Sequence, residues 1–186
     1  QAIKQGKLDF VAMGRALQSD PDLPNKLARG REKEIRPCIH CNHCIETLAW
    51  AEGVVCVVNP ALGMEKEFEI KKAAKPKKVI IVGGGPAGME AARVAALRGH
   101  QVTLYEKERK LGGQLILAAI PPHKQVINKL TAYMIHQLRK LKVKVVLGKA
   151  ITAEEIKKLE SKSAKWVASD ALRELVSDAV QKRLRR

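Results

Sequence analysis

The sequence predicts an α/β protein in which a small open βαβ domain follows an irregular, cysteine-rich segment. Two observations carry this prediction. From residue 79 to residue 106, an apolar stretch, a glycine loop, a helical pattern and a second apolar stretch follow one another in the order of a βαβ unit. Upstream, all four cysteines of the chain lie between residues 38 and 56, where the hydrophobic pattern has little regular periodicity. Such a segment suits folding around a bound metal centre.

The composition is that of a globular protein with one core or two small ones. No apolar run approaches the roughly 20 residues that cross a bilayer, so we expect no membrane partner. The chain shows no signal-sequence pattern, and clustered cysteines are typical of a reducing compartment, so we expect a cytoplasmic protein. The net charge of +16 attracts polyanions, but only 3% of the residues are aromatic and the lysines are mostly scattered along helical stretches. Nucleic acid is therefore not the expected partner.

Residues 1–30 resemble the end of something larger. We expect a short strand at Phe10–Met13, then cap-like residues at Ser19 and Asp20, a proline turn and a short helix to Gly30. One strand cannot form a sheet, so its partner strands are expected to precede residue 1.

Residues 71–78, KKAAKPKK, are expected to be a linker, and residues 161–186 an amphipathic helix with a basic end. Between them the pattern predicts three strands and three helices. In chain order these are a strand at Val79–Val82, a helix at Pro86–Arg98, a strand at Gln101–Tyr105, a helix at His123–Leu141, a strand at 143–148 and a short helix at 152–160.

The glycine loop after the first strand has the spacing of a dinucleotide-binding fingerprint. Gly83, Gly85 and Gly88 form G-x-G-x-x-G, and Glu106 closes the second strand about 20 residues further on. The first glycine permits the tight turn, the second lets the backbone approach a pyrophosphate, and the third lets helix and strand pack closely. The helix start offers amide donors to the phosphates, and Glu106 can accept hydrogen bonds from a ribose.

A second glycine pair follows in KLGGQL, residues 110–115. Together, VIIVGGGPAGMEAARVAALRGHQVTLYEK and LGGQL resemble the FAD-binding domain of the pyridine-nucleotide-disulfide-oxidoreductase type, in which the second pair lies along the FAD. The resemblance favours FAD over NAD at this fingerprint. The residues that it implies at the cofactor are Gly83, Gly85, Pro86, Ala87, Gly88, Glu106, Lys107, Gly112, Gly113 and Gln114.

The cysteines are spaced C-x2-C-x2-C at Cys38, Cys41 and Cys44, with Cys56 after eleven more residues. Zinc sites usually bring cysteines in two separated pairs, whereas three close thiolates and one remote one suit the corners of a 4Fe-4S cluster. The spacing therefore favours iron-sulfur and leaves zinc as the alternative. His40 and His43 are expected to lie near the centre or to be exposed without ligating it, and His123 is given no role.

The order of these motifs resembles the old-yellow-enzyme-related iron-sulfur flavoenzymes: 2,4-dienoyl-CoA reductase, clostridial enoate reductase and trimethylamine dehydrogenase. The resemblance covers residues 1 to about 160. It implies the tail of a TIM barrel at 1–30, a 4Fe-4S segment at 31–70 and a partial Rossmann-like FAD-binding domain at 79–160. It further implies that Gly14 and Arg15 bind an FMN phosphate. The cluster ligands that it implies are Cys38, Cys41, Cys44 and Cys56.

In that family NAD(P)H reduces FAD, electrons pass singly through the cluster to FMN, and FMN reduces an activated C=C bond. The resemblance thus implies a fragment of such an oxidoreductase, with FMN bound only together with the missing barrel. We assign no catalytic residue, and we expect no complete reductase activity from this chain. Residues 161–186 match nothing expected next in the family.

Two alternatives remain open. One is an electron-transfer or assembly subunit that works with a separate barrel-bearing partner or as a homo-oligomer. The other is a basic nucleic-acid-binding module built around zinc, which leaves the dinucleotide fingerprint unexplained.

Overall fold

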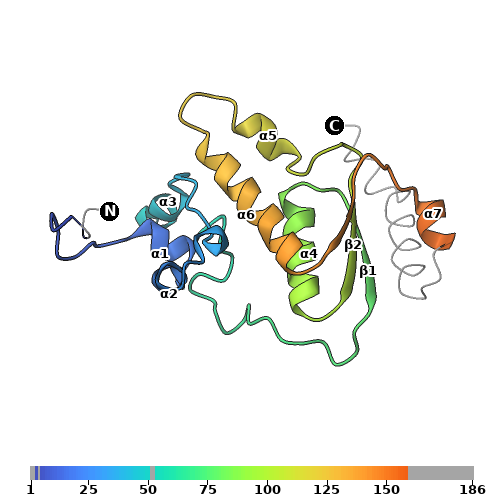
Figure 1. Ribbon diagram of the computed structural model, residues 1–186, viewed down its shortest axis with the longest axis horizontal. Coiled ribbons are helices and arrows are strands. Elements are labelled where there is room, and N and C mark those ends of the chain that lie inside the picture. Colours follow the sequence, from blue (N-terminus) through green and yellow to red (C-terminus); the bar gives the residue numbers. More distant parts are fainter. Residues whose placement is uncertain (1–2, 4, 51–52, 159–186) are drawn as a thin grey trace. The chain divides into compact units, whose positions relative to one another are not determined.

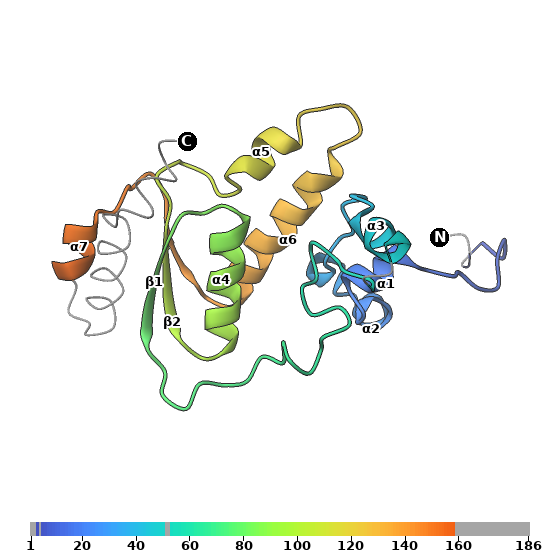
Figure 2. The ribbon, with the colours of Figure 1, turned by 180° about the vertical axis from the view of Figure 1, so that it is seen from behind.

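The computed structural model describes residues 3, 5–50 and 53–158 (Figures 1 and 2). It divides into two compact units, residues 1–69 with 121–133 and residues 70–120 with 134–186. Among the described residues, none of the helices combines the length and apolar character needed to cross a membrane.

The second unit is a βαβ fold with a three-stranded parallel sheet (Figure 1). Its elements are β1 (Lys78–Val82), α4 (Pro86–Leu97), β2 (Gln101–Tyr105), α5 (Gln114–Ala118), β3 (Lys144–Val146) and α7 (Ala153–Lys158). The strand order is β1-β2-β3, and all pairs are parallel. The prediction of a mixed α/β domain with a parallel sheet is confirmed, and the predicted strands and helices of this unit are found within a few residues of their expected ends.

The register of the sheet brings the carboxyl ends of the strands together. Val82 of β1 pairs with Tyr105 of β2, which in turn pairs with Val146 of β3. The glycine loop after β1 and the acidic residue after β2 therefore emerge side by side at one edge of the sheet. This edge is where ligands bind in open α/β sheets.

A small apolar core holds α4 against the sheet. Met89 and Ala92 lie on one face of α4, and Val102 and Leu104 alternate with polar residues along β2. All four side chains are buried, as is Leu138 of α6 (Val126–Lys140). The apolar spacing in the sequence thus produces the packing that fixes the start of α4 next to the end of β1.

The first unit consists of short helices joined by irregular segments. In chain order these are α1 (Arg15–Ser19), α2 (Leu23–Ala28), the 3-10 helix η1 (Glu32–Glu34), α3 (His43–Ala49) and the first half of α6. The buried Asp20 carboxylate, directly after α1, connects α1 to α2 and to the segment after η1. It accepts hydrogen bonds from Lys26 Nζ at 2.6 and 2.8 Å and from the Arg36 amide at 2.7 Å. The buried charge is thereby both paired and hydrogen-bonded.

The predicted strand at Phe10–Met13 is wrong, because these residues form no regular secondary structure. The Phe10 side chain is 89% exposed. A strand requires backbone partners on a neighbouring strand, and no described residue pairs with this segment.

The short helix predicted after the proline turn is found as α2, whereas the separate helix α1 that precedes the turn was not predicted. Ser19 is the last residue of α1 and does not cap the start of a helix. Its hydroxyl donates hydrogen bonds to the carbonyls of Ala16 and Arg36. A new helix then starts with Pro24 in its first turn. Helices α3 and α5 were not predicted, and the predicted helix at 161–186 lies outside the described residues.

Candidate functional site

The glycine loop joins β1 to α4 in a tight turn. Gly83 has a φ of +100°, which favours glycine, and its amide donates to the Tyr105 carbonyl at 2.8 Å. A Cβ atom on Gly88 would lie 1.9 Å from the Gly83 carbonyl oxygen, so a side chain there would force α4 away from the turn. These are the turn and packing roles that the fingerprint predicts for the first and third glycines.

The second glycine of the fingerprint differs from the third. Gly85 has ordinary backbone angles (φ −75°, ψ −178°) as the N-cap of α4, and a Cβ atom there would meet nothing within 4 Å. The protein itself therefore does not require glycine at this position. Pro86 and Ala87 follow as exposed residues in the first turn of α4, where the geometry of a helix leaves amide groups without intrahelical partners.

Glu106 lies buried beneath this loop, directly after β2. Its carboxylate accepts hydrogen bonds from the Gly84 amide at 2.5 Å and from the Glu108 amide at 2.8 Å. The N–H groups of Glu108 and Gly84 lower the pKa of Glu106 against the opposing effect of burial. A buried, ionised carboxylate is thus held in a fixed orientation at the end of the second strand.

The sequence interpretation missed the part of Gly84 in this arrangement. A Cβ atom on Gly84 would lie 2.4 Å from Leu111 Cδ2 and 2.9 Å from Glu106 Oε2. The signal that could have found it is the unbroken run of three glycines, since the fingerprint itself requires only the outer two.

The second glycine pair folds onto the first loop. The Gly112 amide donates to the Gly84 carbonyl at 2.9 Å, and a Cβ atom on Gly113 would lie 3.0 Å from the Gly85 Cα. Gly113 also has a φ of +51°. Two backbone segments therefore pass each other closely beside the start of α4. Lys107 and Gln114, the remaining residues that the resemblance implies at the cofactor, are exposed.

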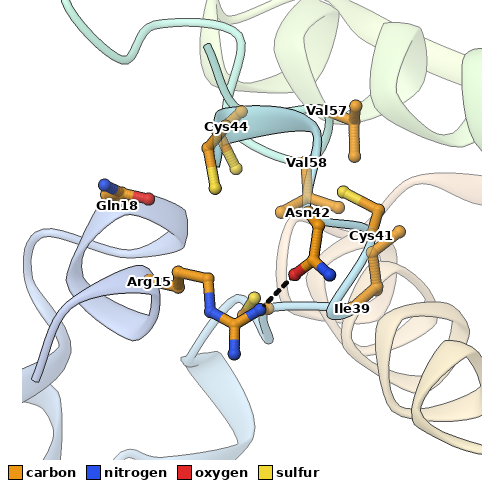
Figure 3. Close-up of a pocket in the computed structure, with 10 residues that line it drawn as sticks. Arg15, Gln18, Ile39, Cys41, Asn42, Cys44, Val57 and Val58 are labelled. Atoms are coloured by element: carbon orange, nitrogen blue, oxygen red, sulfur yellow. Dashed lines mark hydrogen bonds between the residues drawn. The ribbon is translucent and has the colours of Figure 1, made fainter. Parts of the chain in front are cut away.

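The second candidate site is a pocket in the first unit, and all four cysteines line it (Figure 3). The thiols are free, Cys41 is exposed and the other three are half-buried. The remaining lining residues are Arg15, Gln18, Ile39, Asn42, Val57 and Val58. Within residues 5–50 and 53–158, no three histidine, cysteine or acidic side chains are close enough to hold a single metal ion. The structure thus brings together four thiols that are up to eighteen positions apart in the sequence, around one pocket.

The loop that carries Cys41 has an uncommon backbone. His40 and Asn42, on either side of it, have φ values of 56° and 60°, in the left-handed region that few residues other than glycine adopt. Asn42 is the N-cap of α3, which carries Cys44 in its first turn. His40 is exposed, and the His43 ring lies 3.1 Å from the Glu46 carboxylate.

Long-range hydrogen bonds hold the two cysteine-bearing segments against α1. The buried Asn59 donates from Nδ2 to the Gln18 carbonyl at 2.8 Å and accepts from Arg36 Nη1 at 3.1 Å. The backbone N–H of Asn59 also donates to the Cys56 carbonyl at 3.2 Å. Because Arg36 lies two residues before Cys38, this one asparagine connects both segments to α1. No local motif in the sequence indicated this role.

Helix α1 directs two polar side chains to the pocket. Arg15 Nη1 donates to Asn42 Oδ1 at 2.5 Å, and Gln18 points from the same helix toward the space beside Cys44 (Figure 3). Gln18 Oε1 is buried and has no hydrogen-bond partner among the described residues. Arg15 was expected at an FMN phosphate and lies here beside the thiol loop. Gly14, its expected neighbour at that phosphate, is exposed at the start of α1.

A fold with this glycine loop, carboxylate and second glycine pair defines a class of nucleotide-dependent redox domain. The family model for FAD dependent oxidoreductases matches residues 78–184, which is more than half of the chain. The chain therefore belongs to the FAD dependent oxidoreductase family. The match continues through most of 161–186, a segment for which residue patterns alone indicated no family.

Individual relatives extend the likeness to the cysteine segment. Cinnamate reductase of Clostridium sporogenes is 41% identical over 182 residues, which are 97% of this chain and 27% of that protein. NADH oxidase of Thermoanaerobacter brockii is 47% identical over 157 residues, 83% of this chain and 24% of that protein. A solved structure of 2-naphthoyl-CoA reductase in complex with 2-naphthoyl-CoA has a TM-score of 0.80 at 38% identity, covering 84% of this chain and 24% of that one.

The chain thus spans about a quarter of the length of the relatives that it matches. The resemblance to old-yellow-enzyme-related flavoenzymes is confirmed by this set of relatives.

Proposed function

We propose that the chain is the FAD-binding and iron-sulfur-binding part of a flavoprotein oxidoreductase that reduces an activated C=C bond. In this proposal electrons from NAD(P)H pass through FAD and a 4Fe-4S cluster to FMN. The observation that carries it is the occurrence, in one chain, of four thiols around one pocket and of an FAD-family glycine loop with a fixed carboxylate.

The residues of the second unit fit FAD. A carboxylate oxygen has two lone pairs, so the Glu106 oxygens keep acceptor capacity for ribose hydroxyls after bonding Gly84 and Glu108. Open space at Gly85 leaves room for a pyrophosphate beside the first turn of α4, where helix geometry places amide donors. FAD bound there supplies hydride acceptance and single-electron release, while the protein residues bind and orient it.

The thiol pocket fits a cluster better than one zinc ion. Zinc binds sulfur at about 2.3 Å, so four thiolates on one ion must lie within about 4 Å of one another. A 4Fe-4S cluster takes one thiolate per iron, and its ligands need not converge on a single point. Four cysteines that line one pocket, with no three described ligand side chains close enough for a single ion, match the second requirement. We assign Cys38, Cys41, Cys44 and Cys56 as the ligands.

A second candidate function is that of an electron-transfer or assembly subunit for a separately encoded barrel protein. The exposed apolar side chains of Leu8, Phe10 and Val11 favour it. Co-purification of a barrel protein with the wild-type chain, and its loss from the Phe10→Asp variant, is the expected result. Equal recovery with both chains would remove this candidate.

The test of the main proposal is to purify the chain anaerobically and to quantify iron, sulfide, zinc and released flavin in the same sample. About four irons and four sulfides per chain, with FAD as the flavin, is the expected result. One zinc per chain without iron or flavin would overturn the proposal and favour the basic, zinc-containing module that binds nucleic acid. That module would bind DNA with an affinity that falls steeply with salt.

A further inference from the structure

We propose that Arg15 and Gln18 are positioning residues for the cluster, donating hydrogen bonds toward its sulfurs from α1 and raising its reduction potential. The inference rests on the proposed function, because it assumes that the thiol pocket holds an iron-sulfur cluster. It assigns to Arg15 a role at the thiols beyond the FMN phosphate that the family resemblance implies.

The two side chains are placed at the pocket. Arg15 and Gln18 are three residues apart on α1, so they project from the same face of that helix. Both line the pocket with the four cysteines, and Figure 3 shows them on the side that faces Cys44 and Asn42. The Asn59 bond to the Gln18 carbonyl fixes the backbone from which Gln18 extends.

The side-chain amide of Gln18 lacks a hydrogen-bond partner for its oxygen. Its Oε1 is buried at the pocket without a hydrogen-bond partner among the described residues. Buried polar atoms are nearly always hydrogen-bonded, so this one points to a ligand. A half-turn of the amide exchanges Oε1 for the Nε2 donor with almost no change of shape. Cluster sulfides and cysteine thiolates are acceptors, so a bound cluster offers the partner that the pocket otherwise lacks.

The charge of Arg15 favours the reduced cluster. Reduction adds one electron to the cluster, breaks no bond and needs no proton, so the centre and its four thiolates become more negative by one charge. The guanidinium of Arg15 carries a positive charge, which stabilises the more negative form. It also has donors left over after bonding Asn42, the residue that directly follows Cys41. Because Arg15 is exposed, solvent weakens the effect without abolishing it.

The test is a redox titration of the anaerobically purified chain, with dithionite as electron donor and the cluster absorbance near 400 nm as readout. Arg15→Gln is expected to lower the ratio of reduced to oxidised cluster about tenfold at a fixed applied potential, which is about 59 mV for a one-electron couple. Gln18→Leu, which keeps the side-chain bulk, should lower it about threefold. Arg29→Gln removes an equal charge from the exposed end of α2 and should leave the ratio unchanged.

Iron and sulfide counts on the same samples distinguish a failure of the proposed function from a failure of this inference alone. A wild-type chain without iron and sulfide overturns the proposed function, and this inference with it. A complete cluster whose ratio is the same in Arg15→Gln, Gln18→Leu and Arg29→Gln overturns the inference alone. If Arg15→Gln loses its iron, Gln18→Leu decides: a lowered ratio supports the inference, and an unchanged ratio overturns it.

Discussion

Two glycines of the same fingerprint allow protein stability and flavin binding to be separated. A Cβ atom on Gly88 would sit 1.9 Å from the Gly83 carbonyl oxygen, more than an ångström inside the closest ordinary contact. The same atom on Gly85 would meet nothing within 4 Å, and the backbone angles there suit any residue. We therefore predict opposite behaviour for Gly88→Ala and Gly85→Ala.

For Gly88→Ala, α4 must move away from the end of β1. Overpacking of this kind typically costs about 1–3 kcal/mol, and the contact here is with rigid backbone, so we expect about 3 kcal/mol. The packing of Met89 and Ala92 against β2 is disturbed by the same movement. Urea unfolding followed by circular dichroism should give a midpoint well below that of the wild-type chain, and FAD binding should be lost together with the fold.

For Gly85→Ala, the free energy of unfolding should change by less than about 1 kcal/mol. A methyl group at a compatible backbone position restricts the unfolded chain, whereas alanine is a clearly poorer N-cap than glycine, so the two effects offset. FAD affinity, measured by fluorescence titration of the apoprotein, should fall at least about tenfold because the methyl group fills the space proposed for the pyrophosphate.

The two variants refute different parts of the reasoning. A Gly88→Ala protein as stable as the wild type would show that α4 does not approach the turn as closely as the structure has it. A stable Gly85→Ala protein that binds FAD with unchanged affinity would remove the pyrophosphate from this loop, although the fold assignment would stand.

Three further predictions concern the buried carboxylates and the thiols. Glu106→Gln should destabilise the second unit at neutral pH. The difference in unfolding free energy between variant and wild type should vanish as the pH falls through the lowered folded-state pKa of Glu106. Urea unfolding at several pH values measures this difference. Asp20→Asn leaves Lys26 without its buried partner, so we expect a loss of about 3 kcal/mol in unfolding free energy, and a loss below about 1 kcal/mol would contradict the pairing. Cys56→Ser should lower the iron content of the anaerobically purified chain, whereas His43→Ala should keep the iron content of the wild type. A Cys56→Ser chain with as much iron as the His43→Ala chain would exclude Cys56 as a ligand.

The sequence was informative where the structure depends on neighbours along the chain. The strands at Val79–Val82 and Gln101–Tyr105 and the helix between them follow from local apolar spacing and from the glycine turn, and all three are found. The Phe10–Met13 strand failed because a strand depends on partners elsewhere, and apolar residues alone do not supply them.

The site was only partly predictable for the same reason. The cysteine spacing indicated a shared centre, but nothing local indicated that Asn59 bonds the carbonyl of Gln18, 41 residues away. The contact of Arg15 with Asn42 spans 27 residues and was equally hidden. Contacts of this range depend on how the short helices pack, and periodicity does not encode that packing.

The most direct test of the account is the electron paramagnetic resonance spectrum of the anaerobically purified chain after reduction with dithionite. Four thiolates around one cluster predict a signal that is absent before reduction and that integrates to about one unpaired electron per chain afterwards. A chain that stays silent after reduction, with one zinc ion and no iron, would contradict the central claim that the cysteine pocket holds an electron-transfer centre.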